Sequence, residues 1–295
     1  MIDARVLPFA YLNGDILPIE QAKIPALDRG FLFGDAIYEV IPVYQGQLFR
    51  AGSHIDRLMD GLAKIHIASS FDAQEWRTVF ATTAKANGAI DQYIYLQVTR
   101  GVSHYRDHAT PSDIDPLVFA MSQKLPPRAK AALEHGIATT LLPDTRWSRC
   151  DIKSTSLLAN VLLRQRAIDD DCVEAILHAD GFVTEGAAST IMMAVDGTLV
   201  VPPNSNAILP GTTRRLVEEL ADTAGIPCQT TRLALDVFMR ADEVMLSAAT
   251  KELLPVTSVD GKAVGNGRPG PIWAALDSAF QEYKLATLAD TDAQP

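Results

Sequence analysis

The order of apolar and polar residues predicts a chain in which strands and helices alternate from the start. Apolar runs flank Asn13-Gly14, a dipeptide that favours a tight hairpin turn, and a second pair of strands at 37–44 and 47–50 turns at Gln45-Gly46. The other strands expected in this region are 93–100 and 117–122.

Two helices are expected between these strands. Ser53 followed by Asp56 indicates an N-cap, and the apolar residues after it repeat at the spacing of one helical face, so we expect a helix at about 53–65. Asp72 and Glu75 form a second capping box ahead of another apolar face.

The periodicity breaks at 123–128, where two consecutive prolines remove backbone donors and fix φ, as suits a connection between domains. We therefore expect an N-terminal domain at 1–122, a linker at 123–128, a C-terminal domain at 129–288 and a disordered tail at 289–295. The strands predicted beyond the linker are 136–142, 173–178, 191–195, 199–201 and 243–247, and the helices are 156–169, 213–224 and 271–283.

Composition narrows the class of protein. The chain has 295 residues, of which 47% are apolar and 21% charged, which is typical of a soluble protein with room for two domains. Its net charge of -10 opposes attraction to nucleic acid or anionic lipid, and no apolar stretch is long enough to span a membrane. Three widely spaced cysteines, without a secretory signal, predict neither disulfides nor a metal site, so we expect a cytoplasmic protein.

Two segments carry candidate chemistry for a phosphate and a carbonyl compound. Gly211, Thr212 and Thr213 stand where a helix begins, so backbone N–H groups and the helix dipole could bind a phosphate, although an ordinary helix cap has the same pattern. Lys153 precedes a largely apolar helix and could form a Schiff base if its pKa is lowered; an exposed surface lysine is the alternative.

Other polar residues are ambiguous when each is taken alone. Glu185 follows a strand and precedes small residues that would let a flat ring approach the backbone, or it is a solvated turn carboxylate. Arg106 and His108 could hold a carboxylate together, or they belong to a solvated polar loop. Tyr38 and Arg57 look like a strand aromatic and a basic residue on a helix surface.

One resemblance joins segments spread over nearly the whole chain. These segments are Asp28–Asp35, Tyr38–Val40, His54–Leu58, Arg146–Lys153, Thr184–Gly186, Leu209–Arg214 and Pro255-Val256. In this order they resemble the class IV, fold-type IV pyridoxal-phosphate aminotransferases, and most closely the D-amino acid aminotransferase branch. The resemblance implies a mixed α/β (α+β) fold with a smaller N-terminal α/β domain and a larger C-terminal pseudo-barrel domain that binds the cofactor.

The resemblance also implies roles for the cofactor residues. Lys153 would hold pyridoxal 5′-phosphate covalently and move a proton to and from the substrate, while Glu185 would keep the pyridine nitrogen protonated so that the ring can accept electrons. Arg57 and the turn at Gly211–Thr213 would bind the phosphate. The other cofactor residues implied are Ala188, Ser189, Ala248 and Ala249.

For the substrate, the resemblance implies that Tyr38, Arg106 and His108 hold the α-carboxylate. The family builds its site between the two domains and completes it with a loop of the partner, which implies a homodimer in which Arg106 and His108 complete the neighbouring subunit's site. Relatives that act on branched-chain L-amino acids usually have glycine where this chain has Val40, which favours the D-specific branch.

Three departures from the family pattern affect these expectations. After Glu185 the chain has Ala187-Ala188-Ser189-Thr190 in place of a hydroxyl run ending in asparagine, and Ala248-Ala249 replaces a serine-threonine phosphate contact. With two side-chain donors missing, each worth about 0.5–1.5 kcal/mol, we expect weaker cofactor retention. The loop before Arg106 is one residue longer than the usual pattern.

The reaction expected from the resemblance is a ping-pong transfer of an amino group from a D-amino acid to a 2-oxo acid such as 2-oxoglutarate or pyruvate. Alternatives are an (R)-amine or branched-chain L-amino acid transaminase on the same scaffold, or an aminodeoxychorismate lyase. A protein that carries the cofactor without catalysis remains a further alternative. The preferred side chain is open, because it depends on the volume of the pocket.

Overall fold

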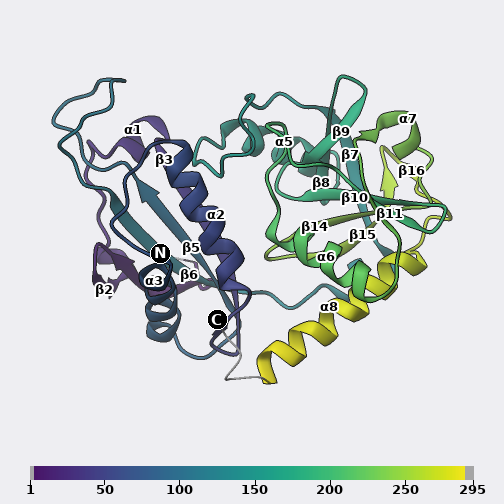
Figure 1. The fold of residues 1–295 in the computed structure, drawn as a ribbon, viewed down its shortest axis with the longest axis horizontal. Coiled ribbons are helices and arrows are strands. Elements are labelled where there is room, and N and C mark those ends of the chain that lie inside the picture. Colours follow the sequence, from purple (N-terminus) through teal and green to yellow (C-terminus); the bar gives the residue numbers. More distant parts are fainter. Residues whose placement is uncertain (1–2, 290–295) are drawn as a thin grey trace. The chain divides into compact units, whose positions relative to one another are not determined.

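The computed structural model describes residues 3–289, which form two compact units (Figure 1). The described part of the first unit comprises residues 3–126, 152–156 and 287–289, and the second comprises Pro127–Asp151 and Leu157–Ala286. The chain first changes unit between the two prolines of the expected linker, although residues 123 and 124 still belong to a strand. Ala289 ends a helix, and the rest of the expected tail, 290–295, lies outside the described residues.

The first unit is an antiparallel sheet with strand order β2-β1-β6-β5-β3-β4. Its strands are β1 (Val6–Leu12), β2 (Asp15–Pro18), β3 (Ala36–Tyr44), β4 (Gln47–Leu48), β5 (Gln92–Thr99) and β6 (Leu117–Lys124). Its helices are the 3₁₀ turn η1 (Ile19–Gln21), α1 (Arg29–Phe33), α2 (Ala51–Lys64) and α3 (Ala73–Ala86). The two hairpins turn at Asn13-Gly14 and Gln45-Gly46 as predicted, with both residues of each turn at positive φ.

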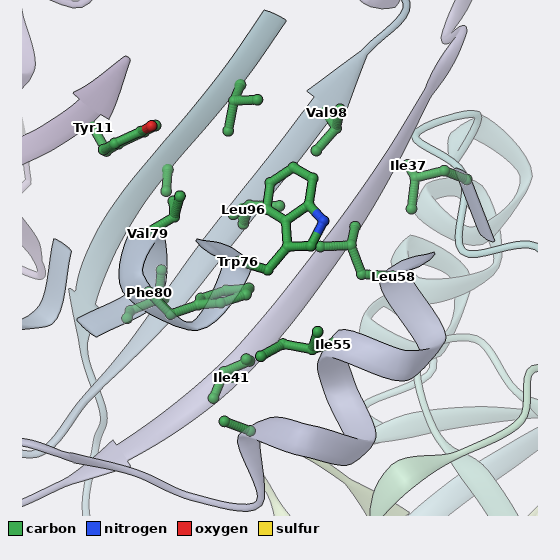
Figure 2. Close-up of a cluster of buried hydrophobic side chains, with 14 of the residues drawn as sticks. Tyr11, Ile37, Ile41, Ile55, Leu58, Trp76, Val79, Phe80, Leu96 and Val98 are labelled. Atoms are coloured by element: carbon green, nitrogen blue, oxygen red, sulfur yellow. The ribbon is translucent and has the colours of Figure 1, made fainter. Parts of the chain in front are cut away.

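The core of this unit lies between one face of the sheet and helices α2 and α3 (Figure 2). Side chains alternate along β5, so that Leu96 and Val98 are buried against Trp76 of α3 and Leu58 of α2. The same alternation along β3 points Ile37 into this core and Tyr38 to the opposite face of the sheet. The sheet therefore has one apolar face and one face available for other groups.

The two helices differ in how well their starts were predicted. Asp72 and Glu75 form the expected capping box, in which each side chain accepts a hydrogen bond of 2.8 Å from the other residue's backbone N–H. The N-cap predicted at Ser53 is wrong, because α2 begins after Arg50, which has a φ of 52°. Ala51 is already buried in the core, so the apolar face of the helix extends further back than the pattern indicated.

The second unit holds a ten-stranded mixed sheet. Its strands are β7 (Ile137–Pro143), β8 (Glu174–Ala179), β9 (Phe182–Gly186), β10 (Thr190–Val195), β11 (Thr198–Val201), β12 (Cys228–Thr230), β13 (Leu233–Ala234), β14 (Glu243–Ala248), β15 (Glu252–Val259) and β16 (Lys262–Ala263). Its helices are α4 (Lys130–His135), α5 (Leu158–Asp169), α6 (Thr212–Thr223), α7 (Leu235–Phe238) and α8 (Pro271–Ala289), the last belonging to this unit as far as Ala286.

A short link forces this sheet to curl. The strand order is β12-β11-β10-β14-β15-β7-β8-β9-β13, with β16 beside β15, so β9 and β10 are five strand positions apart. In a flat sheet these positions would separate them by about 24 Å. Only residues 187–189 join the two strands, a distance of at most about 15 Å. The sheet therefore closes toward a barrel and brings the end of β9 next to the start of β10.

The described residues contain no helix that is both long and apolar enough to cross a membrane.

The core of the first unit can be tested at Phe80, which is fully buried and packs among α2, α3 and the sheet. Phe80→Ala should lower the free energy of unfolding of this unit by about 3–5 kcal/mol, because it opens a cavity that the sheet cannot close. Phe9→Ala, at a residue that is 37% exposed, is the control and should cost less than about 1 kcal/mol. Urea unfolding followed by circular dichroism measures both; equal losses would contradict this placement of the core.

Candidate active site

Lys153 is held in the first unit by backbone pairing with strand β3. The backbone N–H of Tyr38 donates to the carbonyl of Lys153 at 3.0 Å, and the N–H of Thr155 donates to the carbonyl of Ala36 at 3.1 Å. The side chain of Lys153 is half-buried, and its Nζ lies 4.2 Å from the centre of the Tyr38 ring. The structure therefore brings together two predicted site residues that are distant in the sequence.

Tyr38 also contacts a second aromatic ring, that of Tyr95. The rings of Tyr38 and Tyr95 stack with centroids 5.6 Å apart and an interplanar angle of 26°. The Lys153 Nζ therefore lies against the face of an aromatic ring that is itself stacked on a second ring. Burial raises the pKa of the Tyr95 hydroxyl above its ordinary value, which keeps that ring uncharged.

Arg57 belongs to a buried cluster around Glu39, the residue after Tyr38. Glu39 has no exposed surface, and its carboxylate accepts hydrogen bonds from Arg57 Nε at 2.9 Å and from Arg57 Nη2 at 2.7 Å. His54 Nδ1 lies 3.0 Å from the same carboxylate. Burial acts to raise the pKa of Glu39, but Arg57 and His54 outweigh it and hold that pKa well below its usual range. Arg57 is thus oriented by an ionised partner and is not a basic residue on a helix surface.

Arg106 and His108 come together on the ring of Phe33, the last residue of α1. The guanidinium carbon of Arg106 lies 5.0 Å from the ring centre, and the His108 ring centre lies 5.2 Å from it. Both side chains are exposed. The three residues predicted to bind a carboxylate therefore fall into two groups, with Tyr38 beside Lys153 and the two loop residues on Phe33.

Glu185 lies within strand β9 of the second unit and not after a strand as expected. Its side chain is buried, with one carboxylate oxygen accepting from Arg146 Nη1 and the other from the backbone N–H of Leu209 at 3.1 Å. Burial raises the pKa of Glu185 to about 7, although Arg146 and the Leu209 N–H act in the opposite direction. A solvated turn carboxylate is therefore excluded, and Glu185 can gain or lose a proton near neutral pH.

Arg146 is itself oriented by Asp144. The carboxylate of Asp144 accepts from Arg146 Nε at 2.9 Å and from Nη2 at 2.7 Å, and the hydroxyl of Thr184 donates to it at 2.7 Å. Burial opposes the ionisation of Asp144, but the bonds from Arg146 keep its pKa below the usual value. The guanidinium of Arg146 is thus bound between two carboxylates, those of Asp144 and Glu185.

The predicted phosphate seat lies at the start of α6, two residues after Leu209. Gly211 is the N-cap, Thr212 and Thr213 open the helix, and the helix dipole favours an anion at this end. A Cβ at Gly211 would lie 2.6 Å from the hydroxyl of Thr190, so only glycine allows the helix to approach β10 this closely. Because Leu209 binds Glu185, the structure brings the predicted carboxylate and the predicted phosphate seat together.

The ends of β10 and β14 complete this region. Thr190 pairs in register with Ser247, and the buried Ser247 hydroxyl finds no hydrogen-bond partner among residues 3–289. Ala248 and Ala249 follow it and are half-buried, as expected for residues beside a ligand site. A buried polar atom without a partner is uncommon in a protein and points to a missing ligand atom or water.

The hydroxyl of Ser189 binds a carboxylate of strand β8. It donates to Glu174 at 3.1 Å, and Lys251 Nζ donates to the same carboxylate oxygen at 3.0 Å. Glu174 is fully buried on β8, whereas Ala188, the residue before Ser189, is exposed and has no polar side-chain group to offer. The Glu174–Lys251 ion pair joins the 187–189 turn to the turn that begins at Ala249, so both turns of the predicted cofactor region are fixed by one carboxylate.

Comparison with known proteins shows the family of this chain. The family model described as amino-transferase class IV matches residues 36–259. The chain is 37% identical over 273 residues to D-alanine aminotransferase of Listeria monocytogenes, covering 92% of this chain and 94% of that protein. It is 35% identical over 274 residues to D-alanine aminotransferase of Staphylococcus haemolyticus, covering 92% and 96%. The chain belongs to the class IV aminotransferases.

Solved structures of class IV aminotransferases share the fold. The branched-chain amino acid aminotransferase of Escherichia coli matches with a TM-score of 0.86 at 26% identity, covering 94% of each chain. The branched-chain aminotransferase of Thermoproteus uzoniensis, solved with norvaline, has a TM-score of 0.83 at 23% identity, over 97% of this chain and 96% of that one. The predicted mixed α/β fold-type IV architecture is therefore confirmed.

The sequence patterns of this class IV aminotransferase did not indicate the charged partners of the candidate site residues. Glu39 lies in the segment Tyr38–Val40, which gave it no role, and nothing in the sequence pointed to Glu174 or Lys251. The only signal for them in the sequence is that they are close to predicted site residues, since Glu39 follows Tyr38 and Lys251 lies two residues after Ala249. The pairing of a carboxylate on β8 with a lysine after β14 follows from strand order, which local patterns do not contain.

The Glu174–Lys251 pair predicts a large effect on stability. Lys251→Met should lower the free energy of unfolding by about 3–5 kcal/mol, because it leaves a fully buried carboxylate without its cation. Lys64→Met, which removes a surface pair with Asp60, is the control and should cost less than about 0.5 kcal/mol. In thermal unfolding of the apoprotein, the double variant Glu174→Gln/Lys251→Met should recover most of the loss; no recovery would exclude the unpaired charge as its cause.

The pKa of Glu185 predicts how the stability of the apoprotein depends on pH. An ordinary glutamate titrates near 4.5, while burial raises the pKa of Glu185 to about 7, so the folded protein binds more protons between these values. The stability contributed by protonated Glu185 is present below the lower value and is lost as the pH rises through the higher one.

Glu185→Gln cannot titrate. The variant's free energy of unfolding relative to wild type should therefore increase by on the order of 2 kcal/mol between about pH 5 and about pH 8. Urea unfolding of both apoproteins at the two pH values measures this, and a difference that is independent of pH would refute the raised pKa.

Proposed function

We propose that this class IV aminotransferase transfers the amino group of a D-amino acid to a 2-oxo acid by a ping-pong reaction that depends on pyridoxal 5′-phosphate. The observation that carries the proposal is the fixed pair of Lys153 and Tyr38 on β3, in a chain that also presents a buried carboxylate beside a helix N-terminus. Its 35–37% identity to D-alanine aminotransferases supports the D-amino acid as substrate.

The donor set of the described residues fits this cofactor. Lys153 offers a primary amine for covalent attachment, and Glu185 offers a buried carboxylate for the pyridine nitrogen. The α6 N-terminus and the unpartnered Ser247 hydroxyl suit the phosphate, and Arg57 would add a positive charge. When bound, the cofactor supplies an electron sink for the negative charge that develops at the substrate's α-carbon.

The candidate site residues would then divide the proton transfers and the binding contacts among them. In the first half-reaction the Lys153 amine would take the proton from the substrate's α-carbon and deliver it to the cofactor's aldehyde carbon, and in the second half it would move a proton in the opposite direction. Tyr38, on whose ring face Lys153 lies, holds the Nζ end of that side chain near the sheet. Glu185 would keep a proton on the pyridine nitrogen, and Arg146 would hold the carboxylate in place for this contact.

The substrate's α-carboxylate would be bound by Tyr38, Arg106 and His108. An arginine and a second donor can bind both oxygens of a carboxylate, which fixes the orientation of the α-carbon. In the proposed homodimer, the loop of one subunit would place Arg106 and His108 in the site of its partner. Locally placed cations are needed because the chain's net charge of -10 repels an anionic substrate.

A branched-chain L-amino acid transaminase is the second candidate function. The observation that favours it is the likeness to the Escherichia coli branched-chain enzyme, with a TM-score of 0.86 and 26% identity. The higher identity to D-alanine aminotransferases and the presence of Val40 argue for the D-amino acid.

The two candidates differ in the first half-reaction, which can be followed by the absorbance change of the cofactor from its aldehyde to its amine form. We expect D-alanine to convert the loaded enzyme at least about 100-fold faster than L-leucine. Faster conversion by L-leucine would overturn the proposal, and no conversion by any amino acid or (R)-amine would indicate a carrier. Lys153→Ala should slow the half-reaction by at least about 100-fold, because it removes the group that moves the proton.

A further inference from the structure

We propose that Arg29 is a positioning residue that fixes the loop carrying Arg106 and His108, with Phe33 as the surface on which both side chains rest. This inference rests on the proposed function, in which the loop binds the substrate's carboxylate. Arg29 opens the helix α1 and, although charged, is only 4% exposed. A buried guanidinium requires partners for its donors, and these partners define what it holds.

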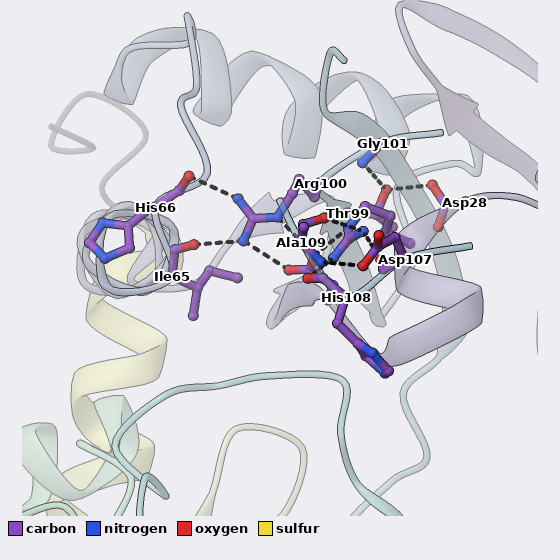
Figure 3. A network of polar contacts seen from close by, with 12 residues as sticks. Asp28, Ile65, His66, Thr99, Arg100, Gly101, Asp107, His108 and Ala109 are labelled. Carbon is purple, nitrogen blue, oxygen red and sulfur yellow. Dashed lines mark hydrogen bonds and ion pairs between the residues drawn. The ribbon is translucent and has the colours of Figure 1, made fainter. Parts of the chain in front are cut away.

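The guanidinium of Arg29 binds three consecutive carbonyls of the loop, those of the residues labelled Asp107, His108 and Ala109 in Figure 3. Nη1 donates to the carbonyl of Asp107 at 2.7 Å and to that of Ala109 at 3.2 Å. Nη2 donates to the carbonyl of His108 at 3.3 Å. These contacts fix the backbone on both sides of His108 and directly after Arg106, so they determine where both side chains start.

Arg29 is in turn anchored to helix α2 through a second arginine. Asp35 Oδ2 accepts from Arg29 Nε at 2.8 Å and from Arg100 Nε at 2.8 Å. Arg100 also donates to the carbonyl of Ile65 at 2.7 Å and to that of His66 at 2.9 Å, at the end of α2 (Figure 3). Burial opposes the ionisation of Asp35, but the two arginines hold its pKa below the usual value. The loop is thereby tied to the helix that carries Arg57.

Phe33 lies at the centre of three cationic or aromatic groups. The guanidinium carbon of Arg29 is 4.9 Å from the ring centre, that of Arg106 is 5.0 Å away, and the His108 ring centre is 5.2 Å away. The backbone contacts of Arg29 set the loop, and the Phe33 ring then limits the rotamers of its two exposed side chains. This removes disorder that substrate binding would otherwise have to offset.

The base of the loop is pinned separately. The hydroxyl of Thr99 donates to Asp28 at 2.6 Å and accepts from the N–H of Gly101 at 3.1 Å (Figure 3). Gly101 has a φ of +114°, and a Cβ there would lie 2.0 Å from the carbonyl of Asp115. The two ends of the loop therefore meet at Gly101, whose carbonyl also accepts a hydrogen bond from the backbone N–H of Arg29 at 2.9 Å. The side chain of Arg29, in contrast, contacts the loop at the segment that bears Arg106 and His108.

Arg29→Lys in the cofactor-loaded enzyme tests this role, because lysine keeps the charge but cannot reach three carbonyls and a carboxylate at once. We expect KM for D-alanine to rise about tenfold or more, with kcat and the Kd for pyridoxal 5′-phosphate changed less than about threefold. Phe33→Leu, which removes the ring but keeps an apolar side chain, should raise KM in the same direction. Arg5→Lys, at an exposed arginine, is the control.

Hydrogen exchange provides a readout that does not depend on the substrate. In Arg29→Lys, amides at 105–110 should exchange at least about tenfold faster, while those of α3 keep their rates. Unchanged exchange at 105–110, or a kcat loss without a KM rise, would overturn the positioning role. A wild-type enzyme that does not convert D-alanine would refute the proposed function, and the exchange rates would still decide whether Arg29 fixes the loop.

Discussion

The backbone pairing of residues 152–156 with strand β3 is the interaction on which the candidate site depends. Without it, Lys153 would be one of many lysines in a connecting segment, with no fixed neighbour. Pairing with Ala36 and Tyr38 places its side chain over the Tyr38 ring, on the face of the sheet opposite the core. Because side chains alternate along a strand, the same stretch of β3 turns Glu39 inward to orient Arg57. One strand thus sets the position of two site cations.

In each unit, largely buried arginines are held by carboxylates, so some of the chain's many acidic residues have a local structural role. Arg57 binds Glu39, Arg146 lies between Asp144 and Glu185, and Arg29 and Arg100 share Asp35. Buried ion pairs contribute little net stability, since desolvation offsets most of the attraction, but they fix side-chain direction closely. Their value here is therefore geometric: they orient guanidinium groups whose remaining surfaces can serve an anionic ligand.

Local patterns in the sequence predicted the elements whose determinants are local. The capping box at Asp72 and Glu75 and the Asn13-Gly14 hairpin are decided by residues close together in the chain. Strand β15 was not predicted; proline is rare inside a sheet, yet Pro255 pairs with Met245 between two neighbouring strands. The candidate site residues show the same limit of local patterns. Motifs indicated Lys153 and Glu185, but not the side chains that long-range packing brings into contact with them. Neither Asp35 between two arginines nor Glu174 beneath Ser189 could be found without the strand order.

The fold does not decide between D- and L-amino acids, and the reason lies in where the specificity can reside. The scaffold matches a branched-chain aminotransferase with a TM-score of 0.86, while the sequence is more similar to D-alanine aminotransferases.

Enantiomers differ only in how the α-carboxylate and side chain are placed relative to the α-carbon. A loop that binds the carboxylate can therefore determine the choice on a shared scaffold, provided that it is held rigidly. Here Arg29 fixes the loop by its backbone carbonyls, whatever the loop's side chains are. Such an anchor tolerates changes of length and sequence elsewhere in the loop while keeping Arg106 and His108 in place.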